Sequence, residues 1–380
     1  MGSVTSAKAV PGAININEAL PLVPEDITAA WCSKVLGKSV KSAVITKEYH
    51  GTASKLIVEL TYEKDNAGPS SICVKGGFNP DLLAKMPMVK FVLRREAEFY
   101  YYVAPLVDLR LPKPYFCTTD TVNGQGIVVM EDLSDDTEFG SPMKPWKVDT
   151  VRSNVEQLAK LHAGTWNPDE SKFPWLTGSD DLGANPYKSM ILALLSPAAF
   201  ADRFAEGSRP PMPDKLNDRE RVVAAFRTLW HDTSAGQSKF RCIIHGDPHV
   251  ANTYIRGGMD GDGEPGFLDW QGLCFGHPFH DLAYFMIGAL TIADRRAHEK
   301  MLVQHYLDTL NACGVAPKLQ LDEVWDEYRK LVFHGFAWAT VGKGLQPEEY
   351  IFAMAERHCA AIVDHGTLEL LESLPGHGTH

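Results

Sequence analysis

The sequence predicts an α+β fold in which a small antiparallel sheet domain is followed by a larger, mainly helical domain. Three observations support this prediction. Alternating and β-branched runs are concentrated between residues 42 and 131, whereas apolar residues recur at helical spacing after residue 148. A stretch rich in Asp, Gly, Ser and Pro, 134–145, separates the two patterns. The chain has 380 residues, 44% of them hydrophobic, so each part can build its own core.

The elements of the first part are predicted in order along the chain. A helix begins with Pro-Glu-Asp, three strands follow between turn-forming residues, a second helix lacks internal Gly and Pro, and two strands flank an Asn-Gly turn. Hairpin-length connections make the strands antiparallel. These elements cover 24–36 (helix), 43–47, 55–62 and 71–74 (strands), 88–102 (helix), and 115–119 and 126–130 (strands).

Helical spacing continues through the second part, and the chain contains no internal repeat. The predicted helices cover 148–163, 189–205, 218–230, 280–289, 294–313, 321–340 and 347–373. The domain organisation that follows is an N-terminal arm and helix at 1–36, a sheet domain at 37–134 and a helical domain at 135–380.

Composition excludes several kinds of protein. With 37 Lys and Arg against 48 Asp and Glu, the formal net charge is −11 and no basic segment stands apart, so a nucleic-acid partner is not expected. No apolar run reaches the ~20 residues that a membrane-spanning helix needs, and no secretory or transit signal begins the chain. The seven scattered cysteines include no Cys-x-x-Cys pair, which favours reduced thiols and a cytoplasmic protein.

The most informative stretch is 242–252, Cys-Ile-Ile-His-Gly-Asp-Pro-His-Val-Ala-Asn, where a short apolar strand leads into a polar loop. Asp247 and Asn252 have four residues between them, which is the spacing of the catalytic loop H-R-D-x-x-x-x-N. In that loop the Asp receives the proton of the substrate hydroxyl and the Asn holds a magnesium ion. Asp247 is therefore the candidate catalytic residue.

A second carboxylate, Asp269, follows another short strand after a glycine-rich turn at 257–263. Phosphoryl transfer needs a metal ion on the nucleotide phosphates, and Mg²⁺ prefers carboxylate and amide oxygens. Asn252 and Asp269 supply such a pair. The alternative is that both Asp residues only cap turns, which the complete set His-Gly-Asp-x-His-x-x-Asn with Asp-Trp disfavours.

The first part of the chain supplies candidates for nucleotide binding. Lys75 ends a predicted strand in the manner of V-A-I-K, whose lysine contacts the α- and β-phosphates. The carboxylate that orients this lysine is expected on the next helix, where Glu96 is favoured over Glu98. The hairpin between the first two strands lacks the G-x-G-x-x-G pattern, and an ordinary turn is the alternative to a phosphate cover. Its candidate residues are Gly51, Thr52 and Ser54.

Together these motifs resemble the aminoglycoside phosphotransferase superfamily of kinase-like enzymes, especially its ecdysteroid-kinase-like and CHK-kinase-like branch. The resemblance covers about 36–363, which is most of the chain. The motifs stand in the family's order, at 74–75, 95–100, 130–133, 158–163, 245–252 and 268–270.

The resemblance implies a bilobal protein-kinase-like fold, with a small antiparallel-sheet N-lobe and a larger, mainly helical C-lobe. It also implies an ATP- and magnesium-dependent phosphotransferase. The implied roles are Asp247 as catalytic base, Asn252 and Asp269 as Mg²⁺ ligands, Lys75 on the phosphates of ATP, Glu96 as the ion-pair partner of Lys75, and Glu131 and Leu133 in the hinge whose backbone meets adenine.

The acceptor is expected to be a hydroxyl group of a small molecule. Asp281 opens the next predicted helix only 12 residues after Asp269, which leaves no room for the activation loop of a protein kinase. The resemblance implies that Asp281 is structural and braces the catalytic loop, and that His162 packs beneath that loop.

Two other functions stay open. A catalytically silent, nucleotide-binding pseudokinase scaffold is the main alternative, although a scaffold does not require the complete set of candidate site residues. A metal-dependent hydrolase built on His245, Asp247 and His249 is the second. The competing interpretation of the two histidines is that both imidazoles brace the loop by hydrogen bonding.

The sequence selects neither the acceptor, nor ATP over GTP, nor an oligomeric state. The expected acceptor pocket includes 168–240 and the chain after Asp281. Acidic residues there suit an aminoglycoside or amino alcohol, and an aromatic cluster suits a sterol-like or macrolide acceptor, while a sugar is a further possibility. Solvated helix faces and core packing explain both sets equally well. The acidic residues are Asp180, Asp181, Glu206, Asp322, Glu323, Asp326 and Glu327, and the aromatic residues are Trp325, Tyr328, Phe333, Phe336 and Trp338.

Overall fold

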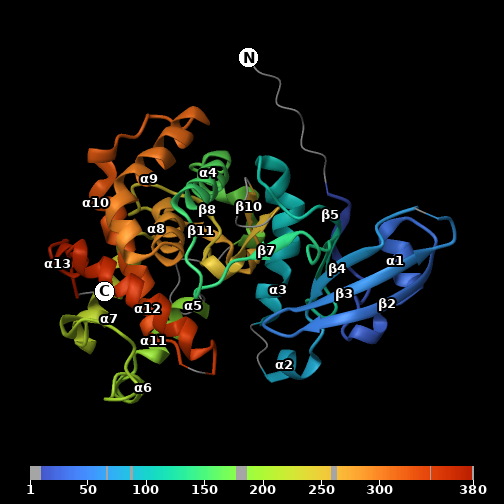
Figure 1. The fold of residues 1–380 in the computed structure, drawn as a ribbon, viewed down its shortest axis with the longest axis horizontal. Coiled ribbons are helices and arrows are strands. Elements are labelled where there is room, and N and C mark those ends of the chain that lie inside the picture. Colours follow the sequence, from blue (N-terminus) through green and yellow to red (C-terminus); the bar gives the residue numbers. More distant parts are fainter. Residues whose placement is uncertain are drawn as a thin grey trace. The chain divides into compact units, whose positions relative to one another are not determined.

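The computed structural model describes residues 10–65, 67–85, 89–176, 186–257, 263–342 and 344–378. It confirms the mixed α+β class (Figure 1). The chain divides into two compact units, 1–138 with 255–273 and 139–254 with 274–380. Residues 255–273, which the sequence analysis places in the helical domain, thus group with the N-terminal unit. Most of the expected turn at 257–263, and the acidic residues Asp180 and Asp181, lie outside the described residues.

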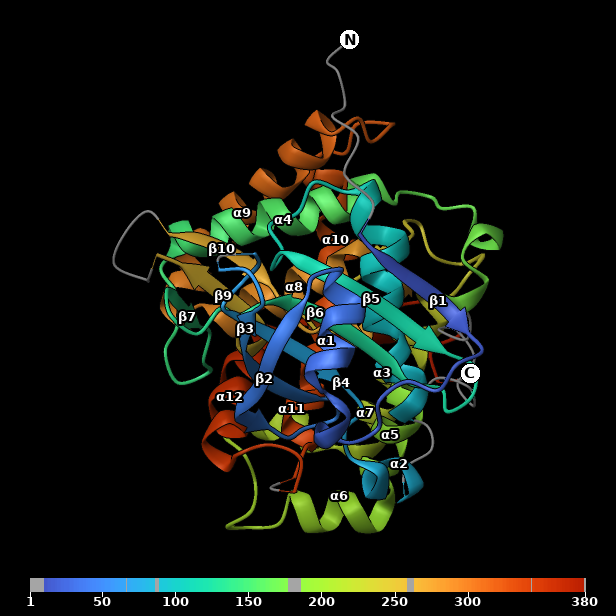
Figure 2. The same cartoon turned by 90° about the vertical axis from the view of Figure 1, so that its right-hand side faces the viewer.

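A six-stranded sheet forms the N-terminal unit, with the strand order β1-β5-β6-β4-β3-β2 (Figure 2). Four of its five pairings are antiparallel, and β1 pairs with β5 in parallel. The five predicted strands are present in their predicted order. The strands are β1 (Gly12–Ile16), β2 (Val40–Tyr49), β3 (Ser54–Tyr62), β4 (Ser71–Gly76), β5 (Pro114–Asp120) and β6 (Gly126–Glu131).

The sequence analysis missed β1 and treated its residues as an arm. This strand has only five residues, and it exists through its partner β5: the Asn15 N–H donates to Thr119 Oγ1 at 2.8 Å, and the Thr118 hydroxyl donates to Ala13 O at 2.8 Å. Such long-range pairing leaves little local signal, because an edge strand needs no strong alternation.

Helices cover the sheet of this unit. The first helix, α1 (Ala29–Leu36), is shorter than the predicted 24–36, because Thr28 caps a new start and Pro24–Asp26 forms a separate 3-10 turn. Gly37 ends α1 in the left-handed conformation with φ 61°. Two helices follow β4, namely α2 (Pro80–Lys85) and α3 (Val89–Glu98), and α3 continues into a π-helical turn, Phe99–Val103.

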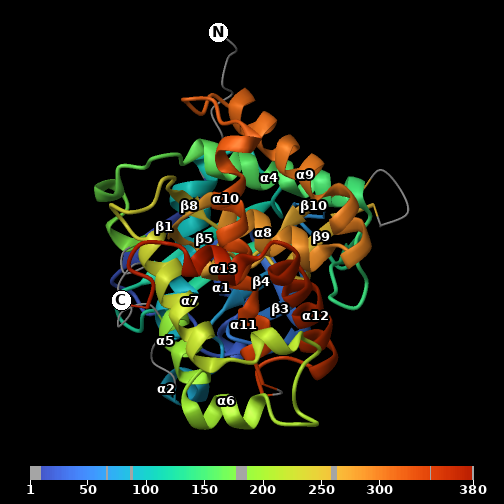
Figure 3. The same ribbon diagram turned by 90° about the vertical axis from the view of Figure 1, so that its left-hand side faces the viewer.

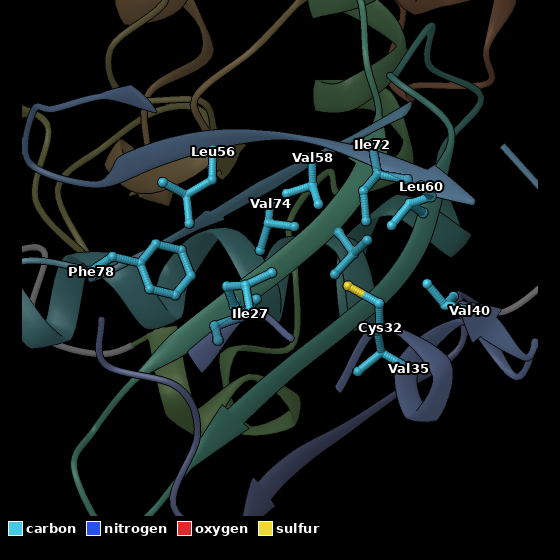
Figure 4. Close-up of a cluster of buried hydrophobic side chains, with 12 residues drawn as sticks. Ile27, Cys32, Val35, Val40, Leu56, Val58, Leu60, Ile72, Val74 and Phe78 are labelled. Carbon is cyan, nitrogen blue, oxygen red and sulfur yellow. The ribbon is translucent and has the colours of Figure 1, made fainter. Parts of the chain in front are cut away.

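The core of the N-terminal unit lies between α1 and one face of the sheet (Figure 4). Alternate residues of β3 and β4 point toward the helix and are fully buried, as the period of a strand requires. The contributing side chains are Ile27, Cys32, Val35, Val40, Leu56, Val58, Leu60, Ile72, Val74, Phe78, Ile127 and Val129.

Truncation of Leu56 tests this core. The side chain has no exposed surface, so Leu56→Ala removes buried methyl groups and leaves a cavity. We expect the free energy of unfolding to fall by about 2–5 kcal/mol in urea titrations. The control is Val44→Ala on β2, whose side chain is 53% exposed and should change stability by less than about 1 kcal/mol. Equal losses in the two variants would contradict this location of the core.

The second unit is mainly helical. Its helix α8 is central and almost entirely buried, with α4, α9, α10 and α12 packed around it (Figure 3). The helices are α4 (Val148–Gly164), α5 (Pro186–Leu194), α6 (Pro197–Arg203), α7 (Arg219–Asp232), α8 (Pro278–Ala289), α9 (Ile292–Ala312), α10 (Leu321–Leu331), α11 (Ala337–Thr340), α12 (Glu348–Asp364) and α13 (Thr367–Glu372). No helix of the described residues is long and apolar enough to cross a membrane.

Three predicted helices are each split in the structure. The predicted 189–205 divides into α5 and α6 because Pro197 begins a new helix. The predicted 321–340 passes through a 3-10 segment, Val332–Phe336, and the predicted 347–373 divides at Gly366, where φ is 58°. Apolar spacing continues across all three breaks, which is why periodicity alone joined them.

Short strands flank the loops of the predicted catalytic motifs. Strands β8 (Cys242–Ile244) and β11 (Cys274–Gly276) pair with each other, and a three-stranded sheet has the order β10-β9-β7. The members of that sheet are β7 (Thr137–Phe139), β9 (Thr253–Arg256) and β10 (Glu264–Phe267). Directly after β7, Gly140 lies against the catalytic loop, where a Cβ would fall 1.9 Å from Val250 O, so only glycine fits.

Candidate active site

A buried ion-pair cluster in the N-terminal unit contains three of the predicted site residues. Lys75, on the central strand β4, is 6% exposed, and its Nζ lies 2.5 Å from Glu96 Oε2 on α3. The same Nζ lies 3.0 Å from Asp269 Oδ1, after β10. The less favoured candidate Glu98 faces away from this cluster and pairs with Arg94 at 3.1 Å.

The charges of this cluster do not balance. Burial by itself lowers the pKa of Lys75, but the negative charges of Asp269 and Glu96 outweigh burial and raise this pKa above its ordinary value. Lys75 is therefore charged at neutral pH. Burial also raises the pKa of Glu96, against the effect of Lys75. One ammonium between two carboxylates leaves a negative surplus when both are ionised, which suits an additional cation.

Asp269 has an unusual backbone. It adopts the left-handed region with φ 63°, which costs of order 1–2 kcal/mol for a non-glycine residue, although Asp tolerates it better than most. The next residue, Trp270, is buried and stacks on Phe99 with ring centroids 3.8 Å apart. Arg95 Nη1 donates to Leu273 O at 2.5 Å. Contacts from α3 and its π-helical extension thus hold the turn that presents Asp269, whose side chain remains 31% exposed.

The remaining nucleotide-binding candidates occupy two loops of the same unit. Gly51 and Thr52 are exposed between β2 and β3, whereas Ser54 is buried and its hydroxyl lies 3.3 Å from His50 Nδ1. Glu131 ends β6, and its Oε1 accepts hydrogen bonds from Lys113 N at 2.7 Å and Arg256 Nη2 at 2.6 Å. Leu133 follows in the connecting segment and is partly exposed. The side chain of Glu131 is thus engaged, so a nucleotide contact there falls to backbone atoms.

The catalytic-loop candidates lie in the second unit, between β8 and β9. The side chain of Asp247 is 49% exposed. Asn252 ends a 3-10 turn, and its Nδ2 donates to Asp247 O at 2.9 Å. This donation leaves Asn252 Oδ1, the kind of atom that Mg²⁺ binds, for another partner. The residue types and their orientation within each unit therefore fit a magnesium ion.

Both histidines of the loop hydrogen-bond within it. His245 Nδ1 accepts from the Asp247 N–H at 3.3 Å, and His249 Nδ1 accepts from the Ala251 N–H at 3.2 Å. Across the described ranges, no group of three or more His, Cys, Asp and Glu side chains is placed to hold a metal ion. These contacts favour the bracing interpretation of the two imidazoles over a hydrolase centre.

Asp281, in the first turn of α8, accepts hydrogen bonds from the catalytic loop. Its Oδ2 accepts from the His245 N–H at 2.6 Å and its Oδ1 from the Gly246 N–H at 3.0 Å, and His162 Nε2 donates to Oδ2 at 3.1 Å. Burial raises the pKa of Asp281, but these histidine contacts outweigh burial and lower it below its ordinary value. The expected bracing role of Asp281 is confirmed, and fully buried His162 contacts the loop through Asp281.

Replacement of Asp281 by Asn should destabilise the protein, because an amide nitrogen in place of one oxygen leaves a buried N–H without an acceptor. We expect the free energy of unfolding to fall by about 1–3 kcal/mol at pH 7. The difference should shrink below about pH 4, because a carboxylate with a depressed pKa loses its contribution only when it is protonated. Urea titrations at both pH values measure this, and exposed Asp308→Asn should stay within about 0.5 kcal/mol of wild type.

The aromatic cluster 325–338 is mostly core. Tyr328, Phe333 and Phe336 have no exposed surface and Trp338 is 5% exposed, whereas Trp325 is partly exposed. The Trp338 ring lies 5.5 Å from the ring of His249 in the catalytic loop. Core packing thus accounts for most of the cluster, as one of the two interpretations proposes.

Comparison with known proteins identifies the family. The sequence profile of the phosphotransferase enzyme family matches residues 92–328, more than half of the chain. The chain belongs to the phosphotransferase enzyme family. The matched residues of this phosphotransferase include Glu96, Asp247, Asn252 and Asp269, whereas Lys75 precedes them. Among curated proteins, none matches the sequence.

Solved structures share the fold of this phosphotransferase. A Ralstonia eutropha protein assigned as an aminoglycoside phosphotransferase superposes with a TM-score of 0.51 and 14% identity, over 90% of this chain and 97% of that chain. The GDP and kanamycin complex of APH(2")-IIia gives 0.50 and 12%, over 88% and 99%. A microcompartment-associated aminopropanol kinase gives 0.49 and 12%, over 90% and 99%. At these identities the first two likenesses show the kinase-like fold.

Sequence reasoning gave no role to two residues that shape the site of this phosphotransferase. Arg95 donates to the carbonyl of Leu273, in the turn after Asp269, and His280 donates to the carbonyl of Gly246, in the catalytic loop. The available signal was position in the sequence, because Arg95 belongs to the motif 95–100 beside Glu96 and His280 stands next to Asp281. Their partners are distant in sequence or on another element, so spacing could not reveal the contacts.

Proposed function

We propose that this phosphotransferase uses ATP and Mg²⁺ to phosphorylate a hydroxyl group of a small molecule. The observation that carries the proposal is the buried contact of Lys75 with both Glu96 and Asp269. A lysine held charged between two carboxylates is costly to bury, and polyphosphate with a divalent cation is the ligand that uses all three groups.

The proposed roles follow from the surroundings of each residue. Lys75 contacts the phosphates of ATP, and Glu96 orients its ammonium group. Asn252 and Asp269 hold magnesium. Asp269 supplies a carboxylate beyond the one that neutralises Lys75, and the hydrogen bond of Asn252 uses Nδ2, so its Oδ1 can bind the metal. Bound Mg²⁺ neutralises charge on the transferred phosphoryl group.

Two further contacts with the nucleotide belong to the proposal. The exposed hairpin at Gly51 and Thr52 covers the phosphates with backbone amides, and buried Ser54 fixes the start of β3. The backbone from Glu131 to Leu133 meets adenine. The N-terminal unit is then the nucleotide-binding lobe, and the helical unit carries the catalytic loop and the acceptor pocket.

Asp247 is the proposed catalytic base. Its backbone is held on both sides, by His245 at the N–H and by Asn252 at the carbonyl, while half of its side chain stays exposed. A carboxylate fixed in this way can orient the acceptor hydroxyl and accept its proton. The surroundings of Asp247 thus supply positioning, which provides much of the rate in phosphoryl transfer.

The acceptor is proposed to be a small molecule, and the chain to belong to the ecdysteroid-kinase-like and CHK-kinase-like branch. Between Asp269 and α8 the chain forms only a 3-10 turn, Trp270–Gly272, and the short strand β11. This segment offers no platform for a protein substrate. No disulfide joins the seven cysteines, all of which lie in the described ranges, and this supports a cytoplasmic location.

A coupled assay of ADP release tests the proposal over a panel of hydroxylated metabolites and antibiotics. Kanamycin belongs in the panel, because a solved structure of the same fold is a complex with it. Amino alcohols belong in it because they are among the acceptors that the sequence leaves open. We expect release that requires both Mg²⁺ and one class of acceptor. Magnesium-dependent ATP binding with no release for any acceptor would favour the pseudokinase scaffold instead.

A further inference from the structure

Side chains hold several peptide groups of the catalytic loop. The N–H groups of His245 and Gly246 donate to Asp281, and the Asp247 N–H donates to His245 Nδ1. The Asp247 carbonyl accepts from Asn252 Nδ2. Gly246 itself has φ 83°, a left-handed conformation that regular structure does not stabilise. The orientation of these peptide groups therefore depends on individual side chains.

The peptide group between Gly246 and Asp247 is held by a residue outside the motif 245–252. The Gly246 carbonyl lies 3.1 Å from His280 Nε2, which projects from the first turn of α8 next to Asp281. A carbonyl oxygen can only accept, so Nε2 carries the proton and donates it. The Gly246 carbonyl and the Asp247 N–H belong to the same peptide plane, which is rigid. His280 thus fixes the plane that leads directly into Asp247.

The ring of His280 is itself held in place. Its centroid lies 3.8 Å from the ring of buried His334, at an interplanar angle of 50°. The Nε2 of His334 lies 3.1 Å from the Tyr187 hydroxyl on α5. Burial lowers the pKa of both histidines, so both imidazoles are neutral at pH 7. A neutral imidazole that packs against a second ring in this way is a fixed donor for Gly246.

We infer that His280 is a positioning residue for phosphoryl transfer, which acts through the Gly246 carbonyl to fix the orientation of Asp247. This inference rests on the proposed function of Asp247 as catalytic base. It assigns His280 no contact with substrate and no proton transfer. Two neighbours on α8 thus hold different groups of the loop. Asp281 accepts from the N–H groups of His245 and Gly246, and His280 donates to the Gly246 carbonyl, which precedes Asp247.

The test compares His280→Gln with His280→Leu. The Gln amide nitrogen can reach the position of Nε2 and donate to Gly246, whereas Leu fills the space without a donor. We expect His280→Leu to lower kcat about 10- to 100-fold with little change in the KM for ATP, and His280→Gln to recover most of the loss. His305→Leu is the control, because it removes an imidazole contact of 2.8 Å, to Glu156, elsewhere in the same unit.

Hydrogen exchange of the peptide 242–254 provides a readout that does not depend on activity. His280→Leu should exchange faster there than wild type, His280→Gln and His305→Leu, while unfolding temperatures stay similar. Equal kcat losses in the Leu and Gln variants, or exchange in His280→Leu identical to wild type, would overturn the inference. Absence of wild-type phosphoryl transfer alongside faster loop exchange in His280→Leu would instead contradict only the proposed function.

Discussion

Replacing Asp247 by Asn is expected to lower phosphoryl transfer by about 100- to 10,000-fold, because the amide cannot accept the proton of the acceptor hydroxyl. The variant should keep its loop, since Asn retains the backbone N–H and carbonyl through which His245 and Asn252 contact residue 247. Asn also has nearly the same shape as Asp. The substitution therefore removes the charge of residue 247 and leaves its backbone contacts in place.

Nucleotide binding is the internal control for this variant. Titration calorimetry with Mg²⁺ and ATP should give an affinity for Asp247→Asn within about threefold of wild type, or roughly 0.7 kcal/mol. Asp202→Asn, on the exposed surface of α6, controls for the loss of one carboxylate and should retain full activity. Near-wild-type transfer by Asp247→Asn would refute its assignment as the base.

The second large effect is expected at Asp269. Asp269→Asn is preferable to an Ala variant, because Asn tolerates the left-handed backbone at φ 63° whereas Ala adds strain. Loss of the carboxylate charge should weaken binding of magnesium-ATP by about 10- to 100-fold, in the range measured when metal-site partners are removed. Binding of ATP without Mg²⁺ should change much less, because Lys75 retains Glu96 at 2.5 Å.

Calorimetry with and without Mg²⁺ separates the two contributions. If Asp269 serves only to pair with Lys75, the affinity for ATP should change equally under both conditions. The magnesium-ligand role predicts a selective loss in the presence of the metal. An unchanged affinity for magnesium-ATP in Asp269→Asn would remove this residue from the metal site.

Elements with strong local patterns were predictable, and elements made by distant contacts were not. The strands β3 and β4 followed from alternation, because one face of each is buried against α1. In contrast, β1 depends on its pairing with β5, about 100 residues away. The break at Gly366 could have been anticipated from glycine alone, but apolar spacing on both sides obscured it.

In the candidate site, too, some features were predictable from sequence patterns and others depended on distant contacts. Motif spacing pointed to the pairing of Lys75 with Glu96, and the family resemblance to Asp281, because these arrangements recur with the fold. The left-handed backbone of Asp269 and the packing of the His280 ring against His334 carry no sequence pattern, since each depends on residues that meet only after folding. Sequence reasoning therefore found the chemical groups, and the structure added what holds them.

The most direct test of the central claim is transfer of the labelled γ-phosphoryl group of ATP to an acceptor identified by the ADP-release panel. The account predicts that wild-type protein with Mg²⁺ places the label on a hydroxyl group of the acceptor, and that Asp247→Asn does not. ADP release without label on the acceptor, or equal labelling by the two proteins, would contradict it.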